Sequence, residues 1–241
     1  MTTPRARSFD AAAALYHAHR PGYPGALFDA VEELAGRPLR GARVADVGAG
    51  TGIASALLDA RGARVVAVEP GDGMAAEFRR AHPAIPVVRG DGNRLPLASG
   101  SVDFLTYAQA WHWTDPARSV PEARRVLRPG GALALWWNDL DTTVPWIAEQ
   151  DRRLRDFFGA VGVPARESLE GLEAVTREVS WSRRIPLEAH LANHASHSAF
   201  LVLGASRTRE FMDAERARLL ALFPDGVVEE AYAVTLHVAA C

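Results

Sequence analysis

One segment, Val44–Gly52, constrains the possible folds of this chain more than any other part of the sequence. Apolar residues lead through an acidic residue into a turn with glycine at every second position, at Gly48, Gly50 and Gly52. A helix is expected over Ile53–Ala60, directly after this turn. Glycine permits a tight backbone path and lets a ligand approach without a Cβ in the way. The segment therefore predicts a nucleotide-type site at the carboxyl end of a buried strand.

Three further segments follow along the chain. Arg64–Glu69 is another apolar run, and it ends in a carboxylate 17 residues after Gly52. A carboxylate in that place can accept hydrogen bonds from both hydroxyls of a ribose. Gly90–Asn93 forms a polar turn, and Glu122–Gly131 predicts a helix that Pro-Gly-Gly ends before an apolar strand over Ala132–Trp137.

Strands alternate with helices over the first 140 residues. We expect strands at Arg43–Val47, Arg64–Glu69, Val87–Arg89, Val102–Tyr107 and Ala132–Trp137. We expect helices at Ser8–Leu15, Pro24–Leu34, Ile53–Ala60, Gly73–Ala81 and Val120–Leu127. Continuously apolar strands separated by helices predict a parallel sheet that is covered on both faces.

The pattern changes after Asn138. An amphipathic helix is expected over Pro145–Phe158, and strands are expected over Val175–Ile185 and Ala231–Ala239. The segment Leu187–Phe223 between these strands predicts helices outside the order of the sheet.

Composition excludes several classes of function. The net charge of −2 provides no basic face for a nucleic acid, and no apolar run approaches the length of a membrane span. The sole cysteine, Cys241, excludes an internal disulfide, and we expect a cytoplasmic protein. All 27 basic residues are arginine, so chemistry that needs a lysine, such as Schiff-base formation, is excluded.

In their order and spacing, the four segments described first resemble the class I S-adenosylmethionine-dependent methyltransferases, closely over residues 10–140 and in outline beyond. The resemblance implies an α/β, Rossmann-like, doubly wound and mostly parallel seven-stranded sheet, with an antiparallel C-terminal hairpin and a small helical lid. It implies one domain over residues 1–241, divided into an N-terminal helical cover (1–40), a cofactor-binding core (41–140) and a C-terminal part (141–241) with the lid at about 187–223.

The resemblance also implies S-adenosylmethionine as cofactor and S-adenosylhomocysteine as product. The residues that it assigns to the cofactor are Tyr16, Arg20, Asp46, Gly48, Ala49, Gly50, Gly52, Glu69, Met74, Asp91, Gly92, Asn93, Ala108 and Gln109. Asp46 would orient the loop or bond the amino group, unless it is a helix cap. Met74 would pack on the adenine, unless it is a core residue. Arg20 would pair with the carboxylate of the cofactor, unless it is a surface arginine.

The remaining assignments divide between the two ends of the same ligand. Asp91, Gly92 and Asn93 would read the adenine, unless they form an ordinary polar turn. Ala108 and Gln109 would touch the methionine part.

The sequence Trp111-His112-Trp113 follows the fourth expected strand, where the acceptor of this family lies. The indoles of Trp111, Trp113 and Trp137 would line a dry acceptor pocket. His112 could take a proton from the acceptor as a general base, or it could be structural. We expect no metal site.

Three histidines repeat at helix-compatible spacing within the expected lid: His190, His194 and His197. We interpret them as a polar face of the lid rather than as metal ligands.

Methylation of a small molecule is the favoured function. The Trp-His-Trp motif and the N-terminal Tyr…Arg-Pro segment resemble a branch that includes trans-aconitate and many secondary-metabolite methyltransferases, which leaves the acceptor open. A non-methylating protein that binds the same cofactor, regulatory or cyclase-type, is an alternative. A nicotinamide-dependent oxidoreductase is less favoured, because its glycines are spaced G-x-G-x-x-G. We expect a monomer or a homodimer.

Overall fold

The computed structural model describes residues 13–159, 169, 171–196 and 198–240. Its sheet has seven strands in the order β3-β2-β1-β4-β5-β7-β6. Their bounds are β1 Arg43–Val47, β2 Arg64–Glu69, β3 Val87–Arg89, β4 Val102–Ala108, β5 Leu127–Leu140, β6 Val175–Pro186 and β7 Val227–Ala240. Neighbouring strands from β1 to β5 run parallel, whereas β7 runs antiparallel to both β5 and β6. The predicted fold class is confirmed.

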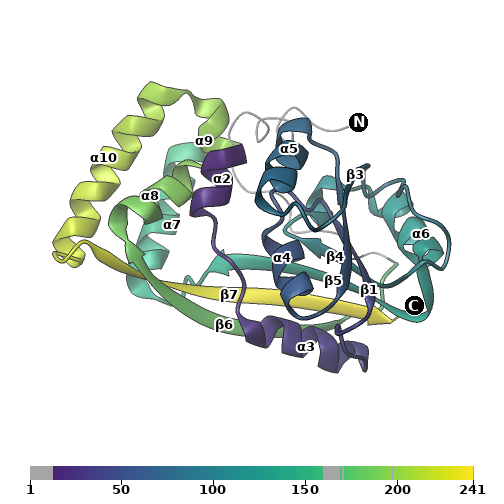
Figure 1. Ribbon diagram of the computed structural model, residues 1–241. Helices are drawn as coiled ribbons and strands as arrows, with labels where there is room; N and C mark the ends of the chain where they lie inside the picture. Colours follow the sequence, from purple (N-terminus) through teal and green to yellow (C-terminus); the bar gives the residue numbers. More distant parts are fainter. Residues whose placement is uncertain (1–12, 160–168, 170, 197, 241) are drawn as a thin grey trace.

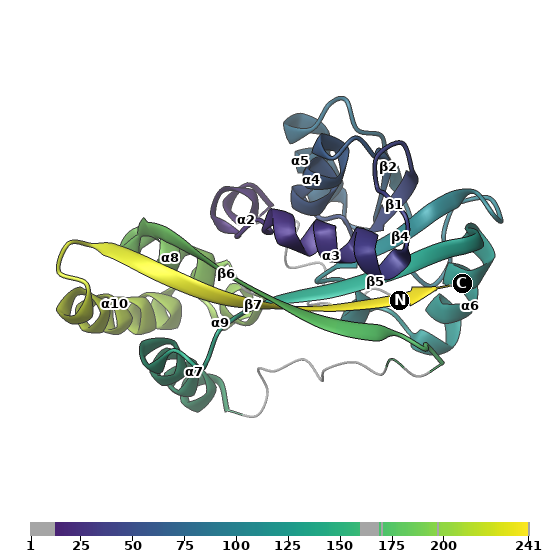
Figure 2. The same cartoon turned by 90° about the horizontal axis from the view of Figure 1, so that it is seen from below.

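Helices cover both faces of this sheet (Figure 2). Their bounds are α2 Ala13–His19, α3 Gly25–Ala35, α4 Ile53–Ala60, α5 Asp72–Ala81, α6 Pro116–Val126, α7 Pro145–Phe158, α8 Leu187–Ala195, α9 Ser198–Leu203 and α10 Ala205–Leu222. Helices α3, α4 and α5 contribute to the hydrophobic core on one face, and α6 contributes to the core on the other. Among the described residues, we find no helix with the length and apolarity that crossing a membrane requires.

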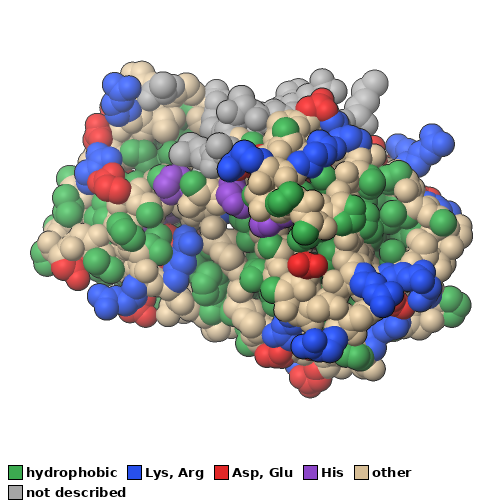
Figure 3. Space-filling view, in the orientation of Figure 1, with side chains coloured by type: hydrophobic (Ala, Val, Ile, Leu, Met, Phe, Trp, Pro, Cys, Tyr) green, Lys and Arg blue, Asp and Glu red, His purple; other side chains and the backbone are tan. Residues whose placement is uncertain are grey.

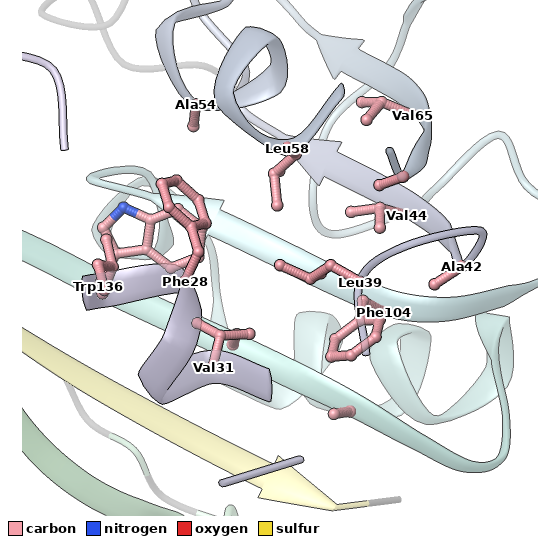
Figure 4. Packing of buried hydrophobic residues seen from close by; sticks show 14 of the residues in the cluster. Phe28, Val31, Leu39, Ala42, Val44, Ala54, Leu58, Val65, Phe104 and Trp136 are labelled. Carbon is pink, nitrogen blue, oxygen red and sulfur yellow. The ribbon is translucent and has the colours of Figure 1, made fainter. Parts of the chain in front are cut away.

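The core on the α3 side is built from alternate residues of the strands and the buried stripes of the helices. Figure 4 shows Phe28 of α3 beside Trp136 of β5, with Leu58 of α4 above them. The Phe28 and Trp136 rings meet edge to face, 6.1 Å apart. Burial of such large apolar side chains is the main force that holds helices to a sheet.

Several boundaries differ from the sequence predictions, among them the start of β7, which is Val227 rather than Ala231, and those of α2, α6 and β5. Helix α2 continues to His19, and the expected start of that helix at Ser8 lies outside the described residues. Helix α6 begins at Pro116, because the Asp115 side chain accepts the Ala117 amide and caps it. Strand β5 begins at Leu127, and its Pro-Gly-Gly segment bulges out of the ladder with β4.

The strand order reverses between β1 and β4, which both lie at the centre of the sheet. In doubly wound folds, ligands bind at the carboxyl ends of the strands at this reversal. The expected cofactor residues of β1 and β4 therefore converge there from segments about sixty residues apart, since Asp46 pairs with Thr106 across the ladder.

Helices α8 and α10 lie at the far end of the long β6–β7 hairpin, as Figures 1 and 2 show. The buried centre of this part is a polar network around the fully buried Glu230. Its carboxylate contacts His190 Nδ1 at 2.7 Å, accepts from Arg183 Nε at 2.6 Å and accepts from the Tyr232 hydroxyl at 2.6 Å. Burial would raise the pKa of Glu230, but the bonds with His190 and Tyr232 outweigh burial and lower that pKa to about 2.

The lid histidines do not form an exposed polar face. His190 and His194 are buried, because α8 packs against the hairpin through this side, so that interpretation was wrong. His197 lies outside the described residues.

Replacing Glu230 should strongly weaken the packing of α8 on the β6–β7 hairpin. In Glu230→Ala, the His190 and Arg183 side chains lose the carboxylate that compensates their burial, and the free energy of unfolding should fall by about 3 kcal/mol. The neighbouring Glu229 is exposed, so Glu229→Ala should change that free energy by less than about 0.5 kcal/mol. Urea denaturation of both variants tests this, and equal effects would contradict it.

Candidate functional site

The three glycines of the loop between β1 and α4, here called the glycine loop, differ in what surrounds their Cα atoms. All have positive φ, at 67° for Gly48, 58° for Gly50 and 93° for Gly52. A Cβ on Gly48 would lie 2.5 Å from the Ala110 Cβ, and one on Gly52 would lie 2.8 Å from the Phe78 ring. A Cβ on Gly50 would meet no atom within 4 Å. Gly48 and Gly52 are therefore needed for packing within the protein, whereas Gly50 faces open space that a ligand can enter.

Glu69 connects this loop to the loop that follows β2. Its Oε2 accepts from the Gly50 amide at 2.8 Å, and its Oε1 accepts from the Gly71 amide at 2.7 Å. The side chain is 6% exposed. Each carboxylate oxygen has more than one lone pair, so Glu69 can hold its loop contacts and still accept from the hydroxyls of a ribose.

Asp46 lies beneath the glycine loop and is fully buried. Its Oδ2 accepts from the Ser55 hydroxyl at 2.6 Å, and its Oδ1 accepts from the Thr106 hydroxyl at 2.9 Å. Burial raises the pKa of Asp46 to about 6, although the bonds from Ser55 and Thr106 oppose that rise. One oxygen thus binds a hydroxyl in the first turn of α4, and the other binds a hydroxyl of β4. This geometry fits the loop-orienting role better than a direct bond to a ligand amino group.

The turn after β3 is fixed from both sides. Asp91 Oδ1 accepts from the Asn93 amide at 2.8 Å, and Asn93 Oδ1 accepts from the Asp115 amide at 2.7 Å. A Cβ on Gly92 would lie 2.8 Å from Thr114. Asn93 and Gly92 thus hold the turn against the loop after β4, and the exposed Asp91 carboxylate is the group of this turn that is accessible to a ligand.

Met74 is 6% exposed in the first turns of α5. In the part of the chain that the structure describes, it belongs to none of the hydrophobic clusters. Because Met74 is buried, an ordinary core methionine and a methionine that packs on the adenine both stay open.

Helix α2 lies over the glycine loop, between α5 and α8 (Figure 1). His17 Nδ1 is 3.1 Å from the Thr51 hydroxyl, and the His17 ring meets the His82 ring at 5.8 Å. Figure 3 shows histidine side chains gathered in this region of the surface. Arg20 follows α2 and acts electrostatically on His194 of α8. Tyr16 lies in α2, but its side chain is outside the described part of the structure.

The segment after β4 is held in an unusual conformation. Gln109 has a φ of 57°, whereas the other positive-φ positions of the described residues are glycines. Its backbone amide donates to the Trp136 carbonyl at 2.9 Å, and its side-chain amide donates to the Asn138 carbonyl at 3.1 Å. Such strain is maintained where the surroundings fix the residue, often at a functional site. Ala108 precedes Gln109 and ends β4, paired with Trp136.

Asn138 is a residue that the sequence analysis missed. Its Oδ1 accepts from Trp181 Nε1 at 3.0 Å, and its Nδ2 donates to the Gly22 carbonyl at 3.5 Å. It therefore joins the N-terminal segment, the end of β4 and the β6–β7 hairpin. The sequence signal that could have identified Asn138 is its position as the polar residue that directly follows the apolar run of β5.

Trp111 is buried, and its place in the wall of an acceptor pocket stays a prediction. It is 1% exposed and packs edge to face on Tyr107 at 4.9 Å within the core on the α6 side. Adjacent residues of the 3₁₀ turn Trp111–Trp113 point in different directions, so one tryptophan enters the core and the other reaches the surface.

The other three residues of the predicted acceptor site do lie together. The His112 and Trp113 rings are 4.6 Å apart, and Trp137 Nε1 donates to His112 Nδ1 at 3.4 Å. Trp113 is 37% exposed. Burial lowers the pKa of His112 to about 4. His237 of β7 adds a ring 5.7 Å from Trp137, and its place there depends on strand pairing that no local motif reveals.

The donor set fits the expected cofactor. Glu69 offers acceptor oxygens for a ribose, Gly50 leaves the loop open, and Asp91 and Met74 present a carboxylate and a thioether. Among the described residues, no three histidine, cysteine, aspartate or glutamate side chains are placed to hold a metal ion.

Several known proteins resemble this chain in sequence or in fold. A family model described as a methyltransferase domain matches residues 45–135. An uncharacterized methyltransferase of Mycobacterium tuberculosis is 38% identical over 221 residues, which cover 90% of this chain and 87% of that protein. A demethylmenaquinone methyltransferase of Beutenbergia cavernae is 42% identical over 106 residues, 44% of this chain and 43% of that protein. A solved structure from Anaeromyxobacter dehalogenans, assigned provisionally as a type II methyltransferase, is 27% identical with a TM-score of 0.72, over 92% of this chain and 97% of that one.

The buried Asp46 carboxyl should make stability depend on pH. Because its folded pKa of about 6 exceeds the reference value of 3.8, the folded state binds the proton more tightly. This contribution is fully present below the unfolded pKa and is lost as pH rises through the folded one. Its size is about 3 kcal/mol. The free energy of unfolding of Asp46→Asn should therefore fall less than that of the native chain between about pH 4 and pH 7.5.

Urea denaturation across this pH range measures the difference between the two chains. Asp59→Asn, at a carboxylate that is exposed on α4, is the control and should follow the native curve. Parallel curves for Asp46→Asn and the native chain would contradict the prediction.

Proposed function

The chain belongs to the class I S-adenosylmethionine-dependent methyltransferases, and we propose that it methylates a small-molecule acceptor beside His112, Trp113 and Trp137. Because the chain belongs to this family, the alternative of a nicotinamide-dependent oxidoreductase is set aside. The single observation that carries the acceptor proposal is that His112, which follows β4, contacts both its neighbour Trp113 and Trp137 of β5. They adjoin the glycine loop through Ala110, which a Cβ on Gly48 would meet.

We propose that the cofactor lies across the carboxyl ends of β1, β2 and β4. When bound, S-adenosylmethionine supplies an electrophilic methyl group on a positively charged sulfur. Glu69 would bind the ribose hydroxyls, Asp91 and Met74 would contact the adenine, and Arg20 with the segment Ala108–Gln109 would contact the methionine part. Catalysis would then rest mainly on orientation of the acceptor and exclusion of water.

The names of the relatives do not choose the acceptor. One relative that matches part of the chain is named for demethylmenaquinone and another for the carboxyl-bearing malonyl-[acyl-carrier protein]. The uncharacterized relatives of highest coverage carry no acceptor in their names. A place in secondary metabolism and the state of monomer or homodimer stay predictions.

We propose that α8, α9 and α10 form the lid that determines which acceptor enters. Helix α8 meets α2, and α2 in turn lies on the glycine loop through His17 and Thr51. The lid is therefore connected to the cofactor site through α2 as well as by the chain.

Glu69→Gln should weaken binding of S-adenosylhomocysteine. The variant loses a charged acceptor, and a hydrogen bond to a charged group contributes about 1.5–3 kcal/mol, which is roughly 10–150-fold in affinity. Glu33→Gln, on the exposed face of α3 where Glu33 pairs with Arg177, is the matched control and should bind normally. Isothermal titration calorimetry measures both, together with NAD, which should not bind. Binding of NAD with no response to S-adenosylhomocysteine would overturn the assignment of the site.

Methyl transfer itself should depend on the same carboxylate. Protein incubated with methyl-labelled S-adenosylmethionine and a panel of small acids, phenols and amines should label at least one class of acceptor. Glu69→Gln should lower the rate at limiting cofactor by about the same 10–150-fold. Tight cofactor binding with no labelled product from any class would favour the non-methylating alternative.

A further inference from the structure

The contact between Trp137 and His112 fixes which nitrogen of His112 carries a proton. An indole N–H can only donate. Because Trp137 Nε1 donates to His112 Nδ1 at 3.4 Å, Nδ1 has to be the unprotonated nitrogen of a neutral ring. The proton of that ring is then on Nε2, which is a hydrogen-bond donor.

The surroundings keep the ring in this neutral state. His112 is partly buried between Trp113 and Trp137, and burial in apolar surroundings disfavours a second proton. The lowered pKa of His112, about 4, has this cause. At neutral pH the ring therefore has one acceptor nitrogen, which Trp137 occupies, and one donor nitrogen.

A general base needs an unprotonated nitrogen that the acceptor can reach. In His112 that nitrogen is bonded to Trp137, so the ring is arranged to donate rather than to remove a proton. We propose that His112 positions an acceptor oxygen that is already ionised, a carboxylate or an acidic phenol or enol, by donating a hydrogen bond from Nε2. This inference rests on the proposed function and replaces the base role expected from the sequence.

The reaction then balances without a base. One lone pair of the oxygen accepts from His112 Nε2, and another forms the new bond to the methyl carbon. The carbon–sulfur bond breaks at the same time, and its electron pair stays on sulfur. The negative charge on oxygen and the positive charge on sulfur are both lost, so no proton has to leave. A neutral amine has a single lone pair, which its attack on the methyl group uses, and it fits this donor poorly.

Trp137 becomes a positioning residue in this scheme, because it acts on the acceptor through the His112 ring. It lies on β5, whose ladder with β4 ends at Ala108 and Trp136. The same pair of strands therefore holds both the segment that carries His112 and the group that orients the ring.

Nuclear magnetic resonance tests the tautomer directly. Protein labelled with ¹⁵N-histidine, in complex with S-adenosylhomocysteine, is examined by long-range ¹H–¹⁵N correlation near pH 7, and the signal that is missing in His112→Gln identifies His112. We expect a neutral ring protonated at Nε2. In Trp137→Phe the preference should be lost, and both tautomers should appear. A ring protonated at Nδ1, or a charged ring, would overturn the proposal even if cofactor binding and methyl transfer are confirmed.

Turnover supplies the second test. With an ionised acceptor, His112→Leu should lose about 10–100-fold in rate, as expected for a bond to a charged group, while His112→Gln should recover most of it because its amide can donate in place of Nε2. Equal losses in both variants, each shown to be folded by its thermal melt and its S-adenosylhomocysteine binding, would overturn the donor role. A labelled product formed from amines in preference to acids and phenols would also overturn it.

Discussion

The buried Asp46 carboxylate is the interaction on which the geometry of the site depends. It binds hydroxyls from β4 and from the first turn of α4, so three elements meet at one group where the strand order reverses. A carboxylate in such a place costs free energy unless it is hydrogen-bonded. The glycine loop lies directly above it, and Glu69 fixes that loop from the next strand. The cofactor side of the site is thus held by two carboxylates with different tasks, one buried and structural, the other at the ligand edge.

On the proposed acceptor side, two side chains near the end of β5 form hydrogen bonds to other segments. Asn138 joins the hairpin, the N-terminal segment and the end of β4, while Trp137 donates a hydrogen bond to His112. These two adjacent residues point to opposite faces of the sheet because the side-chain period of a strand is two. One strand end therefore contacts the covering elements on one face and the proposed acceptor residue His112 on the other.

The sequence predicted the parallel strands, the glycine loop and Glu69 at the end of β2, because these follow from local patterns, whereas the seven-stranded arrangement was implied by the family resemblance. It could not separate Trp111 from Trp113, since their different exposure depends on how a short turn packs on Tyr107. The burial of His190 depends on Glu230, which is forty residues away and contacts it only in the folded hairpin. The contact of His112 with Trp137 likewise joins residues from different segments of the chain. The Asp115-Pro116 cap of α6 was present in the sequence and was overlooked.

Strand β7 pairs with β5 over Ala132–Leu140, and it continues beyond that pairing with β6 alone as far as Val227. The helices beyond β6 are thus attached to the central sheet by an unbroken ladder of backbone hydrogen bonds, which resists bending at any single residue. Their angle to the site is set by the twist of this ladder. A change in the twist of this two-stranded arm would move α8 and α10 together, while the parallel half of the sheet keeps its own geometry.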